Sequence, residues 1–225
     1  MQAQAVRLPI RVVAALILAC PAAAARADGV ARSVNVVLED QFRNRHETAR
    51  LRGDVVVLVY AERHGAEAAR DLGRRLHLRF HPTADRAEAA QWSRQPVVAP
   101  AGWPAGATPP DVHVVPIACV PEVPKPLYPV ARSRLRQESP HVSVWLDFDD
   151  VMRQNFGMAE GVPNVAVVDT AGRPHRVVSG RLDQLAFEEL VGTIERVRLA
   201  ALPPARTAAL PAEQPGGVVP ASAVR

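Results

Sequence analysis

The sequence predicts an α/β domain with a central mixed sheet and helices on both faces. Residues 55–60 (VVVLVY) form a continuous apolar run, which is typical of a strand buried on both faces. Residues 61–76 follow with apolar positions at helical spacing and charged positions between them. A second buried run at 165–168 (VAVV) leads into a turn and a returning strand. A buried strand followed by an amphipathic helix is half of a parallel α/β unit, and the hairpin adds antiparallel strands.

The start of the chain, residues 1–27, predicts an export signal. Two arginines precede an apolar stretch at 12–19 (VVAALILA) that is too short to span a bilayer. Ala25-Arg26-Ala27 fits the small-x-small cleavage pattern, so the mature chain is expected to begin at Asp28. The predicted location is therefore periplasmic or extracellular, with no membrane-spanning segment after cleavage.

A lipid anchor is an alternative to a plain cleaved signal. Residues 17–20 (ILAC) loosely resemble a bacterial lipoprotein box, which would place a lipid on Cys20. Leu18 and Pro21 fit that box poorly, and we therefore favour the cleaved signal.

Composition after cleavage argues against a nucleic-acid role. The leader holds three arginines and no acids, so its removal lowers the net charge from +4 to +1. Only Cys119 of the two cysteines then remains, and one thiol cannot form a disulfide within its own chain.

The middle of the chain alternates short predicted strands with connections. Residues 34–38 predict a strand, and residues 76–80 predict a further brief one. A Pro-, Gly- and Ala-rich insertion at 81–110 predicts a long surface excursion that its tryptophans pin to the body. Residues 112–118 predict a strand in which Pro116 indicates an edge position or a bulge.

The second half predicts a helix at about 127–137 and then a compact block at 142–180. This block reads strand, short helix, Gly-Val-Pro, strand, tight turn, strand. A final helix is expected after Asp183, its predicted N-cap, and the Pro/Ala/Gly-rich tail at 202–225 is expected to be disordered.

Pro163 is unusual because it directly precedes a buried strand. Proline has no N–H to donate to the ladder, and a cis Val162-Pro163 bond at the start of the strand would resolve this. The sequence therefore predicts a cis peptide here.

Two stretches of the chain resemble known proteins. Residues 51–60 (LRGDVVVLVY) resemble the start of the first central strand in redoxin domains, and the 142–180 block resembles the second half of a thioredoxin-like domain. The resemblance, to the redoxin type found in peroxiredoxins and extracytoplasmic thiol reductases, implies a three-layer α/β/α sandwich over residues 28–201. It also implies that a cis-proline at 163 would border a groove for an extended peptide, formed by Val162, Pro163 and Asn164.

The same resemblance exposes a departure. In those families the turn after the first central strand carries a Cys-x-x-Cys or a lone peroxidatic cysteine, whereas residues 61–67 here read AERHGAE. Without a thiolate at this turn, dithiol reductase activity is not expected.

Candidate catalytic residues are therefore few. Cys119 is the remaining thiol, and it would need a cation or helix end to lower its pKa; a buried apolar role is favoured. His64 lies in the cysteine-free turn, where an exposed turn residue is favoured over a general base or ligand. A copper or zinc site built from His64, His81, His113 and Cys119 has no compact spacing in its favour, and no metal or cofactor is predicted.

Three aspartates at 147, 149 and 150 suggest a cation cluster, but capping of the following helix by Asp149 or Asp150 is favoured. The leading hypothesis is an exported thioredoxin-like protein that binds a peptide or another exported protein near Val162-Pro163. A single-cysteine peroxidase or redox sensor using Cys119 is the first alternative, and a periplasmic metal carrier is the second.

Overall fold

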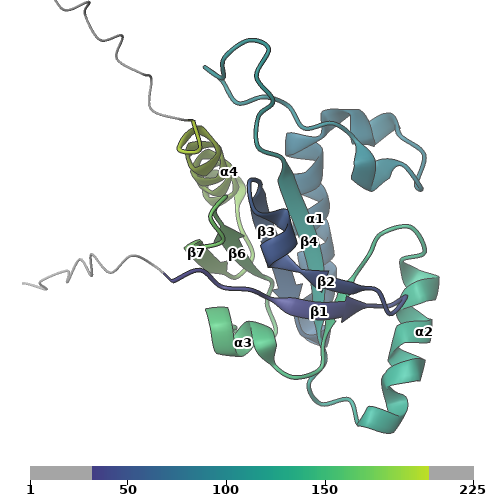
Figure 1. The fold of residues 1–225 in the computed structure, drawn as a ribbon. Helices are drawn as coiled ribbons and strands as arrows, with labels where there is room; N and C mark the ends of the chain where they lie inside the picture. Colours follow the sequence, from purple (N-terminus) through teal and green to yellow (C-terminus); the bar gives the residue numbers. More distant parts are fainter. Residues whose placement is uncertain (1–31, 203–225) are drawn as a thin grey trace, which may run out of the picture. The chain divides into compact units, whose positions relative to one another are not determined.

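The computed structural model describes residues 32–202 (Figure 1). The predicted signal peptide and the tail beyond residue 202 lie outside the described residues. The strands are β1 Val37–Asp40, β2 Arg45–Glu47, β3 Val55–Ala61, β4 Val112–Cys119, β5 Trp145–Asp147, β6 Asn164–Val168 and β7 Pro174–Ser179. The α-helices are α1 Ala66–Phe80, α2 Tyr128–Glu138, α3 Val151–Phe156 and α4 Gln184–Leu199.

The strands form one mixed sheet in the order β2-β1-β5-β4-β3-β6-β7. β4 runs parallel to both β3 and β5, whereas β6 runs antiparallel to β3 and β7 antiparallel to β6. A parallel pair needs a crossover, and α1 supplies it between β3 and β4. The predicted α/β class with a central mixed sheet is confirmed.

β3 is the centre of the sheet, and all seven of its residues are buried. Successive side chains of a strand point to opposite faces. Val55, Val57 and Val59 accordingly pack in one core cluster, and Leu58 and Tyr60 pack in the other. This two-sided burial explains why the sequence of β3 shows no polar alternation.

Helices cover both faces of the sheet, but unequally. α1 and α4 share the first core cluster, and α3 contributes Met152 to the second (Figure 1). α2 buries none of its residues. The predicted three-layer sandwich is therefore present, with a thin second layer. None of the helices described between residues 32 and 202 is long and apolar enough to cross a membrane.

Two boundaries differ from the sequence prediction. The brief strand predicted at 76–80 is wrong, because α1 continues to Phe80. Leu76, His77 and Phe80 extend the buried stripe of that helix. The prediction failed because a short apolar run fits the two-residue period of a strand as well as the 3.6-residue period of a helix. The strand predicted at 34–38 lies instead at Val37–Asp40.

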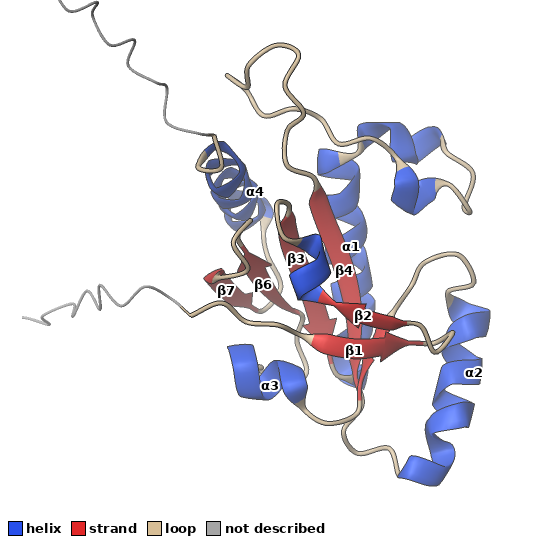
Figure 2. Cartoon of the chain, viewed as in Figure 1, coloured by secondary structure: helices blue, strands red, loops and turns tan. Residues whose placement is uncertain are grey.

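The predicted insertion at 81–110 adds no strand to the sheet and consists of loop with two short 3₁₀ turns (Figure 2). Buried side chains of the two main helices hold its backbone. His77 Nε2 donates to the carbonyl oxygen of Trp92 (2.9 Å), and its ring lies 3.8 Å from the Trp92 ring. The fully buried Arg198 of α4 donates to the carbonyl oxygens of Val98 (2.8 Å) and Pro110 (3.0 Å). Trp92 thus pins the insertion as predicted, whereas the indole of Trp103 donates to the carbonyl oxygen of Ala107 within the insertion itself (3.1 Å). Arg198 provides a second attachment that the sequence did not reveal.

Pro116 occupies a local edge of β4. It pairs with Val59 of β3 on one side, while the ladder with β5 begins only at Ile117. A missing N–H at this position removes no hydrogen bond to β5, which is consistent with the predicted edge position.

Candidate functional site

Three segments meet at the carboxyl ends of the central parallel strands. β3 ends at Ala61 and β4 at Cys119, and the antiparallel β6 begins beside them at Asn164, which pairs with Tyr60. Ligands of open α/β sheets bind outside the carboxyl ends of the strands, where neighbouring connections diverge. This end of the sheet is therefore the candidate site.

The turn between β3 and α1 carries charge in place of thiols. A single 3₁₀ turn at Arg63–Gly65 leads into α1, and the side chains of Arg63 and His64 are exposed. His64 is thus an exposed turn residue, as favoured from the sequence. Glu62 points to α3, where it accepts a hydrogen bond from Arg153 Nη2 (2.8 Å).

Gly65 brings this turn into direct contact with the loop before β6. A Cβ at residue 65 would lie 2.6 Å from the carbonyl oxygen of Val162 and 2.7 Å from its carbonyl carbon. Real Cβ atoms do not approach main chain this closely, so only glycine fits. Gly65 does not stand out in the sequence, because a glycine in a turn has many ordinary explanations.

The predicted cis peptide at Val162-Pro163 is wrong, because the described residues contain no cis peptide bond. The ladder with β3 starts at Asn164, one residue after the proline. Pro163 therefore needs no N–H group for a hydrogen bond to β3. The awkward proline is accommodated by its place just outside the strand.

Asn164 organises the loop that was predicted to bind. Its buried side chain donates from Nδ2 to the carbonyl oxygens of Ala159 and Val162, both at 3.0 Å. Its Oδ1 accepts from the N–H of Ala159 (2.9 Å) and from the hydroxyl of Ser179 (2.6 Å). The carbonyl of Val162 therefore has a partner within its own chain, and Asn164 holds the loop in place.

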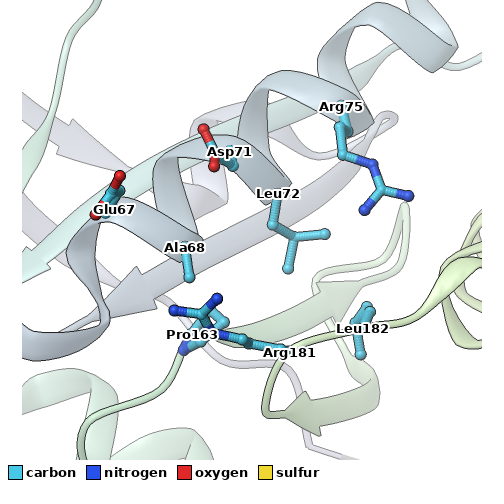
Figure 3. A pocket seen from close by; sticks show the side chains of 8 residues that line it. All are labelled: Glu67, Ala68, Asp71, Leu72, Arg75, Pro163, Arg181 and Leu182. Atoms are coloured by element: carbon cyan, nitrogen blue, oxygen red, sulfur yellow. The ribbon is translucent and has the colours of Figure 1, made fainter.

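A groove of about 410 Å³ runs beside Pro163 (Figure 3). One wall is a face of α1 formed by Glu67, Ala68, Asp71, Leu72 and Arg75. The facing wall is Pro163, together with Arg181 and Leu182 from the loop that precedes α4. Of the three residues predicted to bind, Pro163 thus lines the groove, whereas Val162 and Asn164 shape the loop behind it.

Cys119 is the free cysteine of the described residues and is only 2% exposed. It packs in the core cluster that also contains Tyr60, Trp145 and Met152. Burial raises the pKa of the Cys119 thiol far above its usual range, and the carboxylates of Asp147 and Asp150 raise it further. A nucleophilic cysteine needs the opposite environment.

The histidines predicted for the metal alternative do not come together. His81 is buried, and its two ring nitrogens lie at the carbonyl oxygens of Gln95 (2.8 Å) and Val112 (3.0 Å). His113 Nε2 lies 3.0 Å from Asp54 Oδ2. No group of three or more potential ligands within residues 32–202 is arranged to hold a metal ion.

The aspartates at 147–150 begin a helix, but not with the predicted cap. Oδ1 of the buried Asp147 accepts from the N–H of Val151 (2.9 Å), and Oδ2 accepts from that of Met152 (2.8 Å). Asp150, at the formal N-cap position, has φ 60° and makes no side-chain cap bond. Asp147 caps α3 from the end of β5, two residues before Asp149 and three before Asp150, the caps that the sequence suggested.

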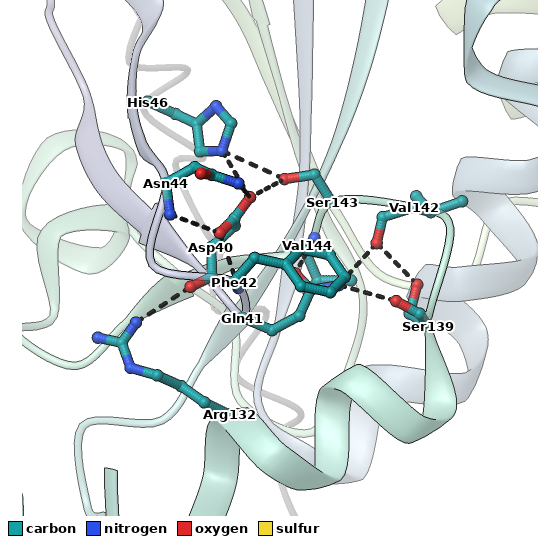
Figure 4. Close-up of polar contacts among 10 residues, drawn as sticks. All are labelled: Asp40, Gln41, Phe42, Asn44, His46, Arg132, Ser139, Val142, Ser143 and Val144. Atoms are coloured by element: carbon teal, nitrogen blue, oxygen red, sulfur yellow. Dashed lines mark hydrogen bonds and ion pairs between the residues drawn. The ribbon is translucent and has the colours of Figure 1, made fainter. Parts of the chain in front are cut away.

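A second polar cluster surrounds Asp40 at the end of β1 (Figure 4). Its Oδ1 accepts from the backbone N–H groups of Phe42 (2.8 Å) and Asn44 (2.9 Å), and its Oδ2 accepts from the Ser143 hydroxyl (2.9 Å). His46 Nε2 lies 2.9 Å from the same Oδ2 and 3.3 Å from Ser143 Oγ. In a catalytic triad the imidazole stands between serine and carboxylate, whereas here Ser143 donates directly to Asp40. The cluster therefore ties β1 to the segment before β5.

The connection of the elements decides the fold. The unit β3-α1-β4 is parallel, the hairpin β6-β7 adds antiparallel strands on the other side of β3, and α4 returns to the face that α1 covers. This is a thioredoxin-like fold.

No protein family matches the sequence, and no curated protein is similar to it. The chain is similar in structure to an exposed lipoprotein thioredoxin from Streptococcus pneumoniae, with a TM-score of 0.46 and 9% identity over 72% of this chain and 99% of that chain. It is also similar to a secreted thiol-disulfide isomerase from Corynebacterium glutamicum (TM-score 0.44, 11% identity, 74% and 84% covered). A peroxiredoxin-like protein from Aquifex aeolicus gives a TM-score of 0.43 at 12% identity, with 74% and 85% covered. The chemistry of the site must therefore be argued from the residues of this chain.

Proposed function

We propose that this protein is an exported thioredoxin-like binding module without thiol oxidoreductase activity, and that it holds an extended peptide segment in the groove beside Pro163. The observation that carries the proposal is a groove at the carboxyl end of the sheet whose neighbouring turn contains no cysteine. Function on a shared fold has to be argued from the site, and this site offers surface for binding but no nucleophile.

The environment of Cys119 supports the absence of thiol chemistry. A buried thiol with a raised pKa has neither the thiolate nor the access that exchange or peroxide reduction requires. The peroxidase or redox-sensor alternative thus lacks a reactive group. The metal-carrier alternative has no ligand cluster among the described residues to support it.

The composition of the groove supports a peptide as the ligand. Ala68 and Leu182, both half-buried, supply apolar surface between charged residues, a combination that suits an amphipathic chain, whereas Leu72 and Pro163 line the groove but are themselves buried. Because the Val162 carbonyl is bonded to Asn164, side-chain contacts in the groove, rather than strand addition at Val162, are the basis of the proposed binding.

Two assays on residues 28–225 test the proposal. Insulin reduction measures dithiol activity, and we expect none above background. Fluorescence anisotropy with labelled, reduced and carboxymethylated ribonuclease, a permanently unfolded chain, measures binding. Robust insulin reduction, or no binding to the unfolded chain, would overturn the proposal.

A groove-filling variant locates the binding. Ala68→Trp places an indole in the groove from a half-buried position, and we expect it to weaken binding at least tenfold. Ala90→Trp, at an exposed position of the insertion, is the matched control and should bind as the wild type does. Equal affinities for the two variants would show that the groove is not the site.

Export is part of the proposal and rests on residues 1–27. Expression of the full chain in a bacterium, followed by mass measurement of the mature protein, is expected to show Asp28 as the first residue. A lipid-modified Cys20 as the first residue would instead establish the lipoprotein alternative. Retention of Met1 in the cytosolic fraction would reject both.

A further inference from the structure

The charges that line the groove have a defined order along α1. Glu67 and Asp71 lie one helical turn apart, and Arg75 follows after one more turn (Figure 3). A helix rises about 1.5 Å per residue, so each charge is displaced by about 6 Å along the wall from the one before it. The wall thus presents two negative charges followed by a positive one.

An extended peptide has nearly the same spacing. Its residues rise about 3.3 Å each and alternate in direction, so side chains two residues apart point the same way and are about 6.6 Å apart. A peptide lying along α1 can therefore place one side chain opposite Asp71 and the next side chain of the same face opposite Arg75.

The side chain of Arg75 is fixed in position by contacts with α4. Its Nη2 donates to Gln184 Oε1 of α4 (3.1 Å), and its guanidinium carbon lies 4.1 Å from the centre of the Phe187 ring. A guanidinium fixed by stacking and one hydrogen bond retains donors for a carboxylate and loses little freedom on binding. The side chains of Glu67, Asp71 and Arg181 make no hydrogen bond or ion pair with other described residues.

The two walls together disfavour ligands with charge of one sign. Arg181, which lines the same wall as Pro163, would repel a run of basic side chains, and Glu67 and Asp71 would repel a run of acidic ones. Specificity through repulsion of the wrong charge is a general device of binding sites. A ligand with a basic side chain near the acidic residues and an acidic side chain near the arginines avoids both kinds of repulsion.

We infer that the groove selects extended segments in which a basic and an acidic side chain stand two residues apart, with the basic residue opposite Asp71 and the acidic residue opposite Arg75. This inference rests on the proposed function, because it assigns the substrate class of the same groove. An apolar residue between the two charged ones points away from α1 and would face Leu182 on the opposite wall.

Labelled decapeptides of alanine and serine test the inference by fluorescence anisotropy. They carry a central Lys-Leu-Glu, Lys-Leu-Lys or Glu-Leu-Glu, or the same Lys and Glu next to each other. We expect Lys-Leu-Glu to bind at least threefold more tightly than each of the others, with a preference that weakens as salt is raised. Equal binding of all four peptides, or tighter binding of a peptide with one sign of charge, would overturn it.

A charge reversal at Arg75 tests whether this residue binds the acidic side chain of the peptide. Arg75→Glu is expected to reverse the preference in favour of Lys-Leu-Lys, because its wall then carries three negative charges. Arg74→Glu, an exposed change on the same helix that does not line the groove, should leave the preference as in the wild type. Circular dichroism checks that both variants fold, and Arg75→Gln serves as a milder second variant that should abolish the preference.

Failure of this inference can be separated from failure of the proposed function. If carboxymethylated ribonuclease binds and Ala68→Trp weakens that binding, while the four decapeptides bind alike, the groove takes peptides without reading their charges. If the ribonuclease does not bind either, the proposed function itself falls.

Discussion

Gly65 is the residue at which two stretches of main chain touch. The turn after β3 and the loop that carries Pro163 could not approach this closely with a side chain between them, since a Cβ would lie 2.6 Å from the Val162 oxygen. The φ of −92° at Gly65 is open to any residue, so the requirement comes from the close approach and not from an unusual backbone conformation. The relative position of the two loops therefore depends on one missing methyl group.

Replacing this glycine should displace the Val162 loop. Gly65→Ala is expected to lower the free energy of unfolding by about 1–3 kcal/mol, the usual cost of overpacking, and to weaken peptide binding in the adjacent groove. Urea denaturation measures the first effect and anisotropy the second. Gly73→Ala is the matched control within α1: nothing lies within 4 Å of its added methyl, so it should stabilise by about 0.5–1 kcal/mol. A neutral Gly65→Ala would show that the two loops separate without cost.

Cys119 gives a second prediction at this scale. Because the thiol is 2% exposed and its pKa is raised by burial, labelling by a disulfide reagent at pH 7 should be at least about 100-fold slower than in denaturant. Cys119→Ser buries a hydroxyl in an apolar cluster and should cost about 1–3 kcal/mol of stability. The same variant should bind peptides with unchanged affinity. Rapid labelling of the native protein would contradict the enclosed environment.

At the scale of elements, α3 depends on a residue outside it. The helix has six residues, too few to be stable alone, and its first turn is held by the carboxylate of Asp147 at the end of β5. The same residue accepts from Val120 through its backbone oxygen (2.8 Å). One aspartate thus couples the start of α3 to the carboxyl ends of β4 and β5.

Asp147→Ala should therefore loosen α3. Loss of the acceptor leaves three backbone N–H groups without their partner, and we expect a decrease of about 2 kcal/mol in stability together with faster amide exchange in residues 151–156. Asp149→Ala is the control, because its side chain accepts no hydrogen bond from other described residues, and its effect should stay within about 0.5 kcal/mol. Equal destabilisation by the two changes would mean that Asp147 is not the cap.

Elements that bury a regular stripe could be predicted from the sequence, and those fixed by long-range polar contacts could not. β3 and β6 followed from their continuous apolar runs, and Asp183 caps α4 as predicted by accepting from Ala186 N–H (2.8 Å). The pairing of Asp147 with α3 and of Arg198 with the insertion depends on tertiary distances that spacing does not encode. The same limit explains the wrong cis peptide at Pro163: the sequence shows a proline before a strand, but the residue at which the ladder begins is set by pairing with β3.

At the scale of the whole molecule, buried polar side chains join segments that lie far apart in the sequence. Asp40 joins β1 to the segment before β5, and His77 joins α1 to the insertion. Burial alone would raise the pKa of Asp40, but hydrogen bonds from His46, Asn44 and Ser143 outweigh it and lower that pKa to about 2. Burial lowers the pKa of His77 to about 4, with the neighbouring His81 acting in the same direction and the Trp92 carbonyl and Asp111 opposing it.

These two pKa shifts predict that the free energy of unfolding falls in two stages as the pH is lowered. The native state favours neutral His77, whose pKa is 6.5 when it is unperturbed, so stability falls by about 3 kcal/mol as the pH drops from about 6.5 to 4 and this contribution then levels off. The native state favours ionised Asp40, whose contribution of about 2 kcal/mol is complete above pH 3.8 and is lost as the pH falls towards 2. Urea titrations at a series of pH values measure both stages.

Two substitutions assign the stages to their residues. His77→Gln keeps a donor for the Trp92 carbonyl and cannot take up a proton, so it should flatten the stability profile between pH 6.5 and 4 while leaving the lower stage in place. Asp40→Asn should flatten the profile between pH 4 and 2, at the expense of stability near neutral pH, because an amide cannot accept all the hydrogen bonds that the carboxylate receives. Since Asp40 lies in β1 and His77 in α1, and the two residues share no hydrogen-bond partner, their effects should add in the double variant. A profile that stays steep above pH 4 in His77→Gln would show that another group controls the first stage.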